Sequence, residues 1–327
     1  MKLHTDSITK LLDTPDPEML QDVLQQAKSL HPGRVLIRGI VEITSYCRQS
    51  CAYCGIRRQN STLQRYRMTA EQILKGTERV HLAGVQTVVI QGGEDPKLEP
   101  EWMAEIIGEI RQRWPNIAIT LSLGEQSRQT YARWKQAGAD RYLLKVETSN
   151  PEIYSELHPG MSLENRIRCL NDIIDVGFVA GSGIIVGLPG QTAEILAKDL
   201  QFLQRKEIGM ISIGPLIPHP DTPLSHLQPG SIETTLAALA LMRCLRPDAL
   251  MPAVSALAAG SEDLRHRGLI AGGDVIMPNF TPADTAKLYS IYPHSQRGRK
   301  NKSLQQALDQ ISLAGLQPDF SRDGGGH

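Results

Sequence analysis

Short apolar segments alternate with amphipathic helical patterns along most of this chain. The apolar segments have the length of buried strands, and we predict strands at 37–43, 86–91, 117–122, 141–147, 179–187, 209–214, 250–254 and 273–277. Apolar residues at helical spacing predict helices at 69–83, 99–113, 127–137, 163–176, 192–205, 231–246, 261–269 and 282–289. The strands thus recur about every 30 residues, the length of a βαβ unit.

Local signals mark the ends of several predicted helices. Thr69 is followed three residues later by Gln72, the pattern of a capping box, and Ser127 and Thr192 stand at the same place before their helices. A glycine in the left-handed conformation commonly ends a helix, and we assign this role to Gly84, Gly138, Gly177 and Gly209.

Eight strand–helix units predict an α/β fold, a parallel (β/α)8 TIM barrel, because alternation requires right-handed crossovers. We expect a helical extension at 1–34, the barrel at 35–295, and a final helix (300–315) and tail within 296–327. In such barrels the chemistry lies at the C-terminal ends of the strands.

Composition excludes two classes of partner. The 327 residues carry 35 basic and 35 acidic side chains, with no run of five like charges, so nothing indicates a nucleic-acid or membrane surface. No apolar stretch reaches the roughly 18 residues of a membrane span. The first residues are polar and lack a signal-peptide pattern, so we expect a cytoplasmic protein.

Three of the five cysteines, Cys47, Cys51 and Cys54, form a C-x3-C-x2-C run after the first predicted strand. A structural zinc site needs four Cys or His ligands, and no second C-x2-C or H-x3-H pair lies nearby. An odd cysteine count argues against disulfides. The run favours a four-iron cluster with one open iron, with zinc as the alternative. Cys169 and Cys244, in helical patterns, are expected to be buried small hydrophobes.

Glycines and polar residues follow other predicted strands. The segment 91–94 (Gln-Gly-Gly-Glu) allows close backbone approach, although a plain βα turn would explain its glycines equally. Thr120 and Ser122 share one strand face, which is typical of ligand contacts, although one hydroxyl could cap the next helix. Lys145 and Glu147 also share a face, and a buried acid and base must pair with each other or with a ligand.

Four further features are less specific. Tyr53, within the cysteine run, could flank a bound nucleoside. The glycine-rich segment 181–192 resembles a phosphate or nucleoside loop but lacks the Lys-Ser/Thr ending of a P-loop. His219 lies in a stiff loop with four prolines (215–223), where a hydrogen-bonded histidine is favoured over a catalytic one. Arg166 follows the pattern of a surface helix residue.

Together these segments resemble the radical S-adenosylmethionine (SAM) enzymes and, more narrowly, the HydE maturases of the [FeFe]-hydrogenase H-cluster. The resemblance covers residues 35–295 and rests on the cysteine run and on the segments 65–69, 91–96, 121–125, 147–151, 187–192, 217–223 and 275–279.

This resemblance implies a barrel closed at one end, with a [4Fe–4S] cluster on Cys47, Cys51 and Cys54 and SAM on the open iron. The positions that match SAM contacts are Tyr53, Gly92, Gly93, Glu94, Ser122, Glu147 and Arg166. The positions that match the substrate cavity are Gln91, Thr120, Lys145, Ser255, Met277, Tyr289 and Tyr292. In the family, the cluster reduces SAM to methionine and a 5′-deoxyadenosyl radical, which acts in assembly of the diiron site.

The chain departs from the family pattern at three places. The stretch 292–300 lacks the cysteines that hold a second cluster in many members, so we expect no second cluster. Lys145 stands where an arginine is usual and cannot form a planar fork to an anion. Val254-Ser255 replaces a Thr-Thr pair of an anion site.

These departures leave other functions open. One is a radical SAM paralogue with a small organic substrate, like methylornithine synthase or biotin synthase, although the latter needs a second cluster. Another is a non-enzymatic iron–sulfur carrier. A closed set of four cysteine ligands would favour a carrier, whereas the open site and the glycine-rich strand ends argue against it. The expected partners are a small-molecule or organometallic substrate, a reducing electron donor and other hydrogenase maturases, with no nucleic acid and no membrane.

Overall fold

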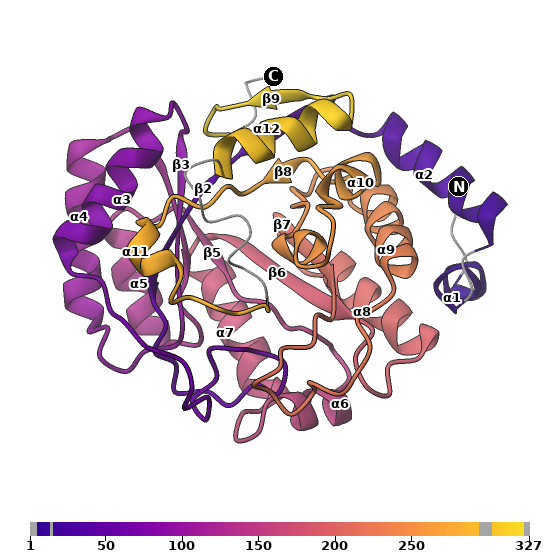
Figure 1. Ribbon diagram of the computed structural model, residues 1–327, viewed down its shortest axis with the longest axis horizontal. Coiled ribbons are helices and arrows are strands. Elements are labelled where there is room, and N and C mark those ends of the chain that lie inside the picture. The colour runs from indigo at the N-terminus through magenta and orange to yellow at the C-terminus, as the bar shows by residue number, and fades with distance from the viewer. Residues whose placement is uncertain (1–4, 14–15, 294–302, 324–327) are drawn as a thin grey trace.

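The predicted barrel is confirmed in a computed structural model that describes residues 5–13, 16–293 and 303–323 (Figure 1). Six parallel strands follow one another in chain order around it. They are β2 (Gly39–Thr44), β3 (Thr87–Gly92), β4 (Ala118–Ser122), β5 (Arg141–Leu143), β6 (Val179–Val186) and β7 (Met210–Pro215). Their inward and outward faces are both buried, as expected for strands enclosed by helices.

The ring is closed by β1 (Arg34–Ile37), which pairs with β8 (Val275–Ile276), and by isolated parallel bridges. The bridges join Met210 to Leu250, Pro252 to Val275 and Ile40 to Asn279. The regular strand predicted at 250–254 is therefore wrong, because Pro252 has no N–H to donate to a ladder. The predicted first strand is also divided, at Arg38, into β1 and β2.

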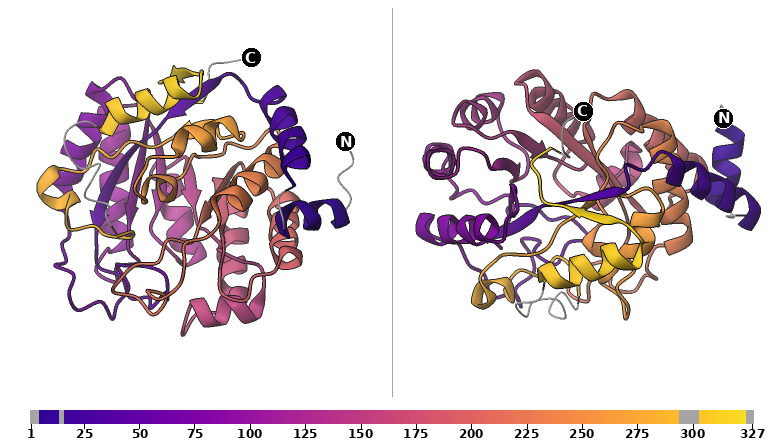
Figure 2. Two further views of the ribbon diagram at one scale, coloured as in Figure 1. Left: turned by 45° about the vertical axis from the view of Figure 1, so that its right-hand side comes forward. Right: turned by 90° about the horizontal axis from the view of Figure 1, so that it is seen from above.

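Helices surround the strands, as Figure 2 shows from above. Between strands lie α3 (Ala70–Leu82), α4 (Pro100–Arg113), α5 (Arg128–Gln136), α6 (Pro151–Leu157), α7 (Leu163–Asp175), α8 (Ala193–Arg205) and α9 (Ile232–Leu245). Thr69, Ser127 and Thr192 cap their helices as predicted. Gly84, Gly138 and Gly177 have the predicted positive φ, but Gly209 does not, because α8 ends in extended backbone at Lys206.

The other predicted elements are shorter than expected. The strand predicted at 141–147 is regular only over β5, and the one at 273–277 only over β8. The helix predicted at 261–269 is regular only as α10 (Arg265–Ile270), and a 3-10 turn (Ser255–Ala258) precedes the predicted range. The helix predicted at 282–289 is regular only over α11 (Ala283–Ala286). Cys169 is buried and Cys244 is half-buried.

The two ends of the described chain pack on the outside of the barrel. The helices α1 (Thr5–Asp13) and α2 (Pro17–Ser29) lie against α8 and α9. After α12 (Ser303–Leu313), β9 (Gln317–Asp319) pairs with β1 at the N-terminal ends of the strands. The domain boundary predicted at 295 falls outside the described residues. No helix in the described part of the chain is long and apolar enough to cross a membrane.

The C-terminal segment forms the floor of the barrel. Phe320 O accepts from the backbone N–H of Gln86 at 3.1 Å. Arg322 O accepts from Thr87 Oγ1 at 3.4 Å and from Arg141 Nη2 at 3.1 Å. Because these residues begin their strands, the segment covers the end of the barrel opposite the cysteine run.

Candidate active site

A cavity of about 550 Å³ is lined by residues from the C-terminal ends of the strands. Its wall includes all three cysteines of the run, Cys47, Cys51 and Cys54. It also includes the predicted residues Tyr53, Gln91, Gly92, Gly93, Glu94, Ser122, Lys145, Glu147, Arg166, Ser255, Met277, Tyr289 and Tyr292. The predicted residue Thr120 does not line the cavity. It lies buried in β4, and its hydroxyl has no hydrogen-bond partner among the described residues.

Arg65 holds the cysteine loop in shape. Its guanidinium donates to the backbone carbonyls of Ser45 (2.5 Å), Ile56 (3.0 Å), Arg57 (2.5 Å) and Asn60 (3.3 Å). These carbonyls lie on both sides of the cysteines, in a loop with no regular ladder to satisfy them. The role of Arg65 was not predicted, although its segment belongs to the resemblance.

The three thiols affect one another. Burial and Cys47 raise the pKa of Cys51 to about 12, and burial and the other two thiols raise the pKa of Cys54 well above its usual value. Three neighbouring thiolates are therefore unfavourable without bound cations, and thiolates are the ligands of iron–sulfur clusters. Across the described ranges, no three His, Cys, Asp or Glu side chains converge as around one ion. A four-iron cluster instead distributes three cysteines over three irons, so the residues fit it.

The end of β3 is tied to the cysteine loop through Glu94. Arg48 Nε and Gln49 Nε2 donate to Glu94 Oε1 at 2.5 and 2.6 Å. A Cβ atom at Gly93 would lie 2.1 Å from Tyr46 O, so only glycine allows this approach. The glycines of 91–94 therefore bring loop and strand together, beyond what a plain turn requires.

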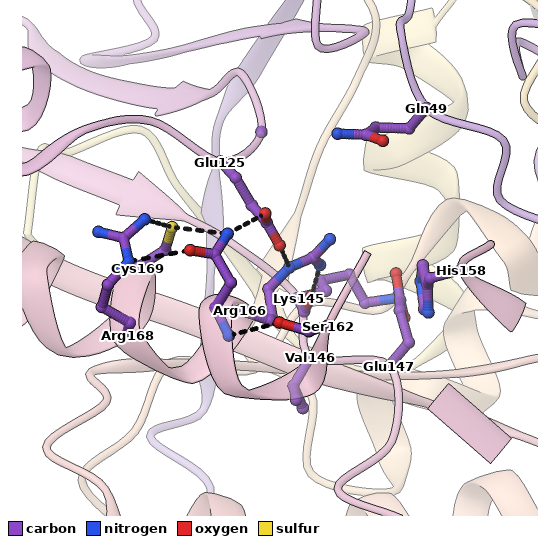
Figure 3. Close-up of polar contacts among 12 residues, drawn as sticks. Gln49, Glu125, Lys145, Val146, Glu147, His158, Ser162, Arg166, Arg168 and Cys169 are labelled. Atoms are coloured by element: carbon purple, nitrogen blue, oxygen red, sulfur yellow. Dashed lines mark hydrogen bonds and ion pairs between the residues drawn. The ribbon is translucent and has the colours of Figure 1, made fainter. Parts of the chain in front are cut away.

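Arg166 is buried, which corrects the surface position that its helical pattern indicates. From α7, its Nε donates to Glu125 Oε1 at 2.6 Å and its Nη1 donates to Lys145 O (Figure 3). Asn165 Nδ2 donates to the other oxygen of Glu125 at 2.6 Å. Burial alone would lower the pKa of Arg166, but Tyr154 and Glu125 outweigh it and the pKa is raised. Glu125, in the loop after β4, was not predicted as a site residue.

Lys145 and Glu147 face the cavity as an ion pair, with Nζ 2.9 Å from Oε2. The Tyr53 hydroxyl donates to Glu147 Oε1 at 3.3 Å. Burial alone would lower the pKa of Lys145, but Glu147 and Tyr292 outweigh it and the pKa is raised. Of the two alternatives for this buried acid and base, the structure shows that they pair with each other, and their contact with a ligand stays a prediction.

His158 supports Tyr53 from behind. Its Nε2 lies 3.1 Å from the Tyr53 hydroxyl and its Nδ1 lies 3.1 Å from Tyr154 O. Burial, with a smaller effect of Arg166, lowers the pKa of His158 to about 3, so the ring is neutral. Its Nδ1–H donates to Tyr154 O, so Nε2 is an acceptor and shares the single Tyr53 hydroxyl proton with Glu147 Oε1. Tyr53 thus connects His158 to Glu147, and both of these residues are labelled in Figure 3. No pattern in the sequence singles this histidine out.

Another part of the cavity wall is formed by amide, phenol and carboxylate groups. Gln91 Nε2 donates to the Tyr289 hydroxyl at 3.3 Å. Glu42, a buried acid of β2 that was not predicted, lines the cavity, and its Oε2 accepts from Asn279 Nδ2 at 2.9 Å. His219 does not line the cavity; its Nδ1 accepts from the Asp221 backbone N–H at 3.1 Å, which supports the hydrogen-bonded interpretation.

The chain is similar in sequence to known proteins. The family model of the radical SAM superfamily matches residues 41–203. The [FeFe] hydrogenase maturase subunit HydE of Thermotoga maritima is 47% identical over 262 residues, which are 79% of this chain and 74% of that protein. A 3-methylornithine synthase of Methanosarcina acetivorans is 24% identical over 97% of this chain and 91% of that protein.

Solved structures show the same fold. The crystal structure of methylornithine synthase (PylB) has a TM-score of 0.86 and 22% identity, covering 98% of this chain and 95% of that one. The structure of HydG, a maturase of the [FeFe]-hydrogenase, has a TM-score of 0.81 and 18% identity, covering 97% of this chain and 72% of that one. The family match and the 47% identity decide the assignment: the chain belongs to the radical SAM superfamily, and within it to the family of the [FeFe] hydrogenase maturase subunit HydE.

Proposed function

We propose that this enzyme cleaves SAM reductively at a [4Fe–4S] cluster on Cys47, Cys51 and Cys54, and acts in assembly of the diiron site of the [FeFe]-hydrogenase H-cluster. The observation that carries the proposal is that the three cysteines, Arg166 and the Lys145–Glu147 pair all line one cavity, with Arg166 held in place by Glu125. When bound, the cluster supplies the electron that breaks the S–C5′ bond of SAM and gives a 5′-deoxyadenosyl radical.

Arg166 is suited to hold the carboxylate of SAM. Glu125 and Lys145 O occupy its Nε and Nη1, and Nη2 has no acceptor among the described residues while the side chain lines the cavity. Because Glu125 fixes the plane of the guanidinium, the orientation of Nη2 is set before SAM binds. A carboxylate at Nη2 would form a charge-assisted hydrogen bond.

Glu147 would accept hydrogen bonds from the donor groups of SAM. Its two oxygens are held by the Tyr53 hydroxyl and Lys145 Nζ, and His158 holds Tyr53 in turn. The Gly93 approach to Tyr46 O leaves backbone at the cavity wall, where SAM can lie close to the chain. These groups bind and orient the ligand, and the cavity wall limits the access of water.

The remaining cavity residues would contact the substrate. Beyond the SAM-contacting positions, the cavity wall contains both polar and apolar side chains, namely Gln91, Met277, Tyr289, Tyr292 and Glu42. We infer a small-molecule or organometallic substrate, an electron donor and other maturases as partners, in the cytoplasm. The 47% identity to a HydE protein supports this substrate class over others.

A radical SAM paralogue with an organic substrate is the second candidate. It is favoured by one observation: the positive charge of Lys145, which stands where the family has an arginine, is paired with Glu147 at 2.9 Å. A charge used in this way attracts an anionic substrate less strongly than a free guanidinium does.

Two experiments test the proposal. Anaerobically reconstituted, reduced protein should bind about four irons per chain and release 5′-deoxyadenosine from SAM; a loaded sample that leaves SAM intact would overturn the radical function. Expression in cells that lack their own HydE-type maturase should restore [FeFe]-hydrogenase activity. SAM cleavage without restored hydrogenase would favour the paralogue. The Cys47, Cys51, Cys54→Ala triple variant is the matched control in both.

A further inference from the structure

Glu147 has a backbone conformation that requires support. Its φ is +67°, and it is the sole non-glycine with positive φ in the described ranges. Such a conformation persists only where the surroundings over-determine it. Two hydrogen bonds to β6 contribute: the Glu147 N–H donates to Gly183 O at 2.9 Å, and Glu147 O accepts from the Ile185 N–H at 3.0 Å.

The two residues after Glu147 are held by one carboxylate. Asp199, on α8, is completely buried. Its Oδ1 accepts from both the N–H and the hydroxyl of Ser149 at 2.6 Å, and its Oδ2 accepts from the Thr148 hydroxyl at 3.0 Å. A buried charge that receives so many hydrogen bonds is fixed in position and fixes its donors.

Gln191 extends the same network into the glycine-rich loop after β6. Its Nε2 donates to Asp199 Oδ2 at 3.3 Å and to Ile185 O at 3.0 Å. Its Oε1 accepts from the backbone N–H groups of Gly187 and Leu188 at 2.8 and 3.3 Å. Those N–H groups are therefore not available to a phosphate, which argues against the phosphate interpretation of 181–192, whereas the nucleoside interpretation stays a prediction. The loop braces the strand that holds Glu147.

We propose that Asp199 is a positioning residue for SAM binding: through Thr148, Ser149 and Gln191 it sets the turn that presents Glu147 to the cavity. The inference rests on the proposed function in one respect, the assignment of Glu147 to SAM. Asp199 itself does not line the cavity, so it acts only through the residues it holds.

Two variants weaken the hydrogen-bond network of Asp199 to different extents. Asp199→Asn replaces one acceptor oxygen with an NH2 group that faces hydroxyl or amide donors, so the turn loses part of its support. Thr148→Val keeps the shape of the side chain and removes one donor to Asp199. Thr148→Ser, which keeps the hydroxyl, is the conservative variant expected to restore native behaviour.

Asp274→Asn is the matched control. Asp274 is also a buried carboxylate that ties backbone together, since it accepts from the Met251 N–H at 2.7 Å and pairs with Arg243 at 2.8 Å. It does not line the cavity. Asp274→Asn therefore reproduces the loss of stability caused by replacing a buried carboxylate, and it leaves the contacts of the Glu147 turn unchanged.

The measurements are the Kd for SAM of oxidised, cluster-loaded protein by calorimetry, and amide hydrogen exchange of residues 147–150 in cluster-free protein. We expect Asp199→Asn to raise the Kd by about 10- to 100-fold, as for other outer-shell supports, and to accelerate exchange at Ser149. Thr148→Val should show smaller changes in the same direction, and Asp274→Asn should show neither at an equal loss of Tm.

Native Kd and native exchange in both Asp199→Asn and Thr148→Val would overturn the inference, as would an equal rise in Kd for Asp274→Asn. If Asp199→Asn fails to fold, the comparison of Thr148→Val with Thr148→Ser, in the Kd for SAM and in amide exchange, decides the inference. If native loaded protein does not bind SAM, the proposed function fails, and the exchange measurement still decides whether Asp199 holds the turn.

Discussion

Arg166 and Glu125 form a buried ion pair, 2.6 Å from Nε to Oε1, across two segments about 40 residues apart in the chain. Their side chains are only 9% and 8% exposed. Each charge is thus acceptable inside the protein because of the other. The wall of the cavity therefore depends on a contact that neither α7 nor the loop after β4 could form alone.

Replacing Glu125 by Gln should destabilise the protein and weaken SAM binding together. An unpaired buried charge costs about 3–5 kcal/mol, and the guanidinium would lose its orientation. Urea unfolding and SAM titration measure the two effects. The control is Glu109→Gln, which breaks an exposed pair with Arg113 and should cost less than about 1 kcal/mol. A Glu125→Gln protein as stable as this control would contradict the prediction.

Cys51→Ala should abolish cluster binding, because only two of the three thiolate ligands would remain. Iron content and visible absorption after anaerobic reconstitution are the measurements. Cys244→Ala, which removes a half-buried thiol outside the cavity, should load iron normally. Iron retained at the native level in Cys51→Ala would refute the ligand assignment.

Arg65→Lys should loosen the cysteine loop without removing its charge. A single ammonium cannot reproduce donation to four carbonyls, and each buried carbonyl left unpaired costs about 1–3 kcal/mol. Loaded protein should then lose iron to a chelator faster than native protein. Arg58→Lys, at an exposed position in the same loop, should lose iron at the native rate, and equal rates in the two variants would disprove the role of Arg65.

His158 should make the protein sensitive to acid. Burial lowers its pKa in the folded protein to about 3, whereas the unfolded chain takes up the proton near pH 6.5. The unfolded state then binds more protons between these values, so the free energy of unfolding falls as pH falls from about 6.5 to 3, by up to about 1.4 kcal/mol per pH unit. His158→Gln should lack this part of the pH dependence. Parallel stability curves for the two proteins would exclude it.

Local signals in the sequence predicted the regular part of the fold well. The capped helices α3, α5 and α8 begin where Thr69, Ser127 and Thr192 indicate, because a cap is a contact within one turn. The strand predicted at 250–254 is wrong, because this segment contains Pro252 and its pairing depends on strands distant in sequence. The strand β9 was missed for the same reason: it pairs with β1 across nearly the whole chain.

The candidate site was predictable where its chemistry resides in one segment. The cysteines form a spacing pattern, and Lys145 and Glu147 lie two residues apart in one segment directly after β5. Glu125 and His158 could not be found in this way, because their roles come from neighbours such as Arg166 and Tyr53. Thr120 was misplaced for a related reason: alternation gives the face of a strand but not the depth at which the cavity ends.

The barrel floor has a consequence for biosynthesis. Residues 317–323 join the starts of β1, β3 and β5, yet the ribosome makes them after every one of those strands. The floor cannot be completed until this segment has left the exit tunnel. A chain still in synthesis therefore exposes Arg141, which is buried in the finished protein, and any stop codon that removes these residues would leave the barrel open at that end.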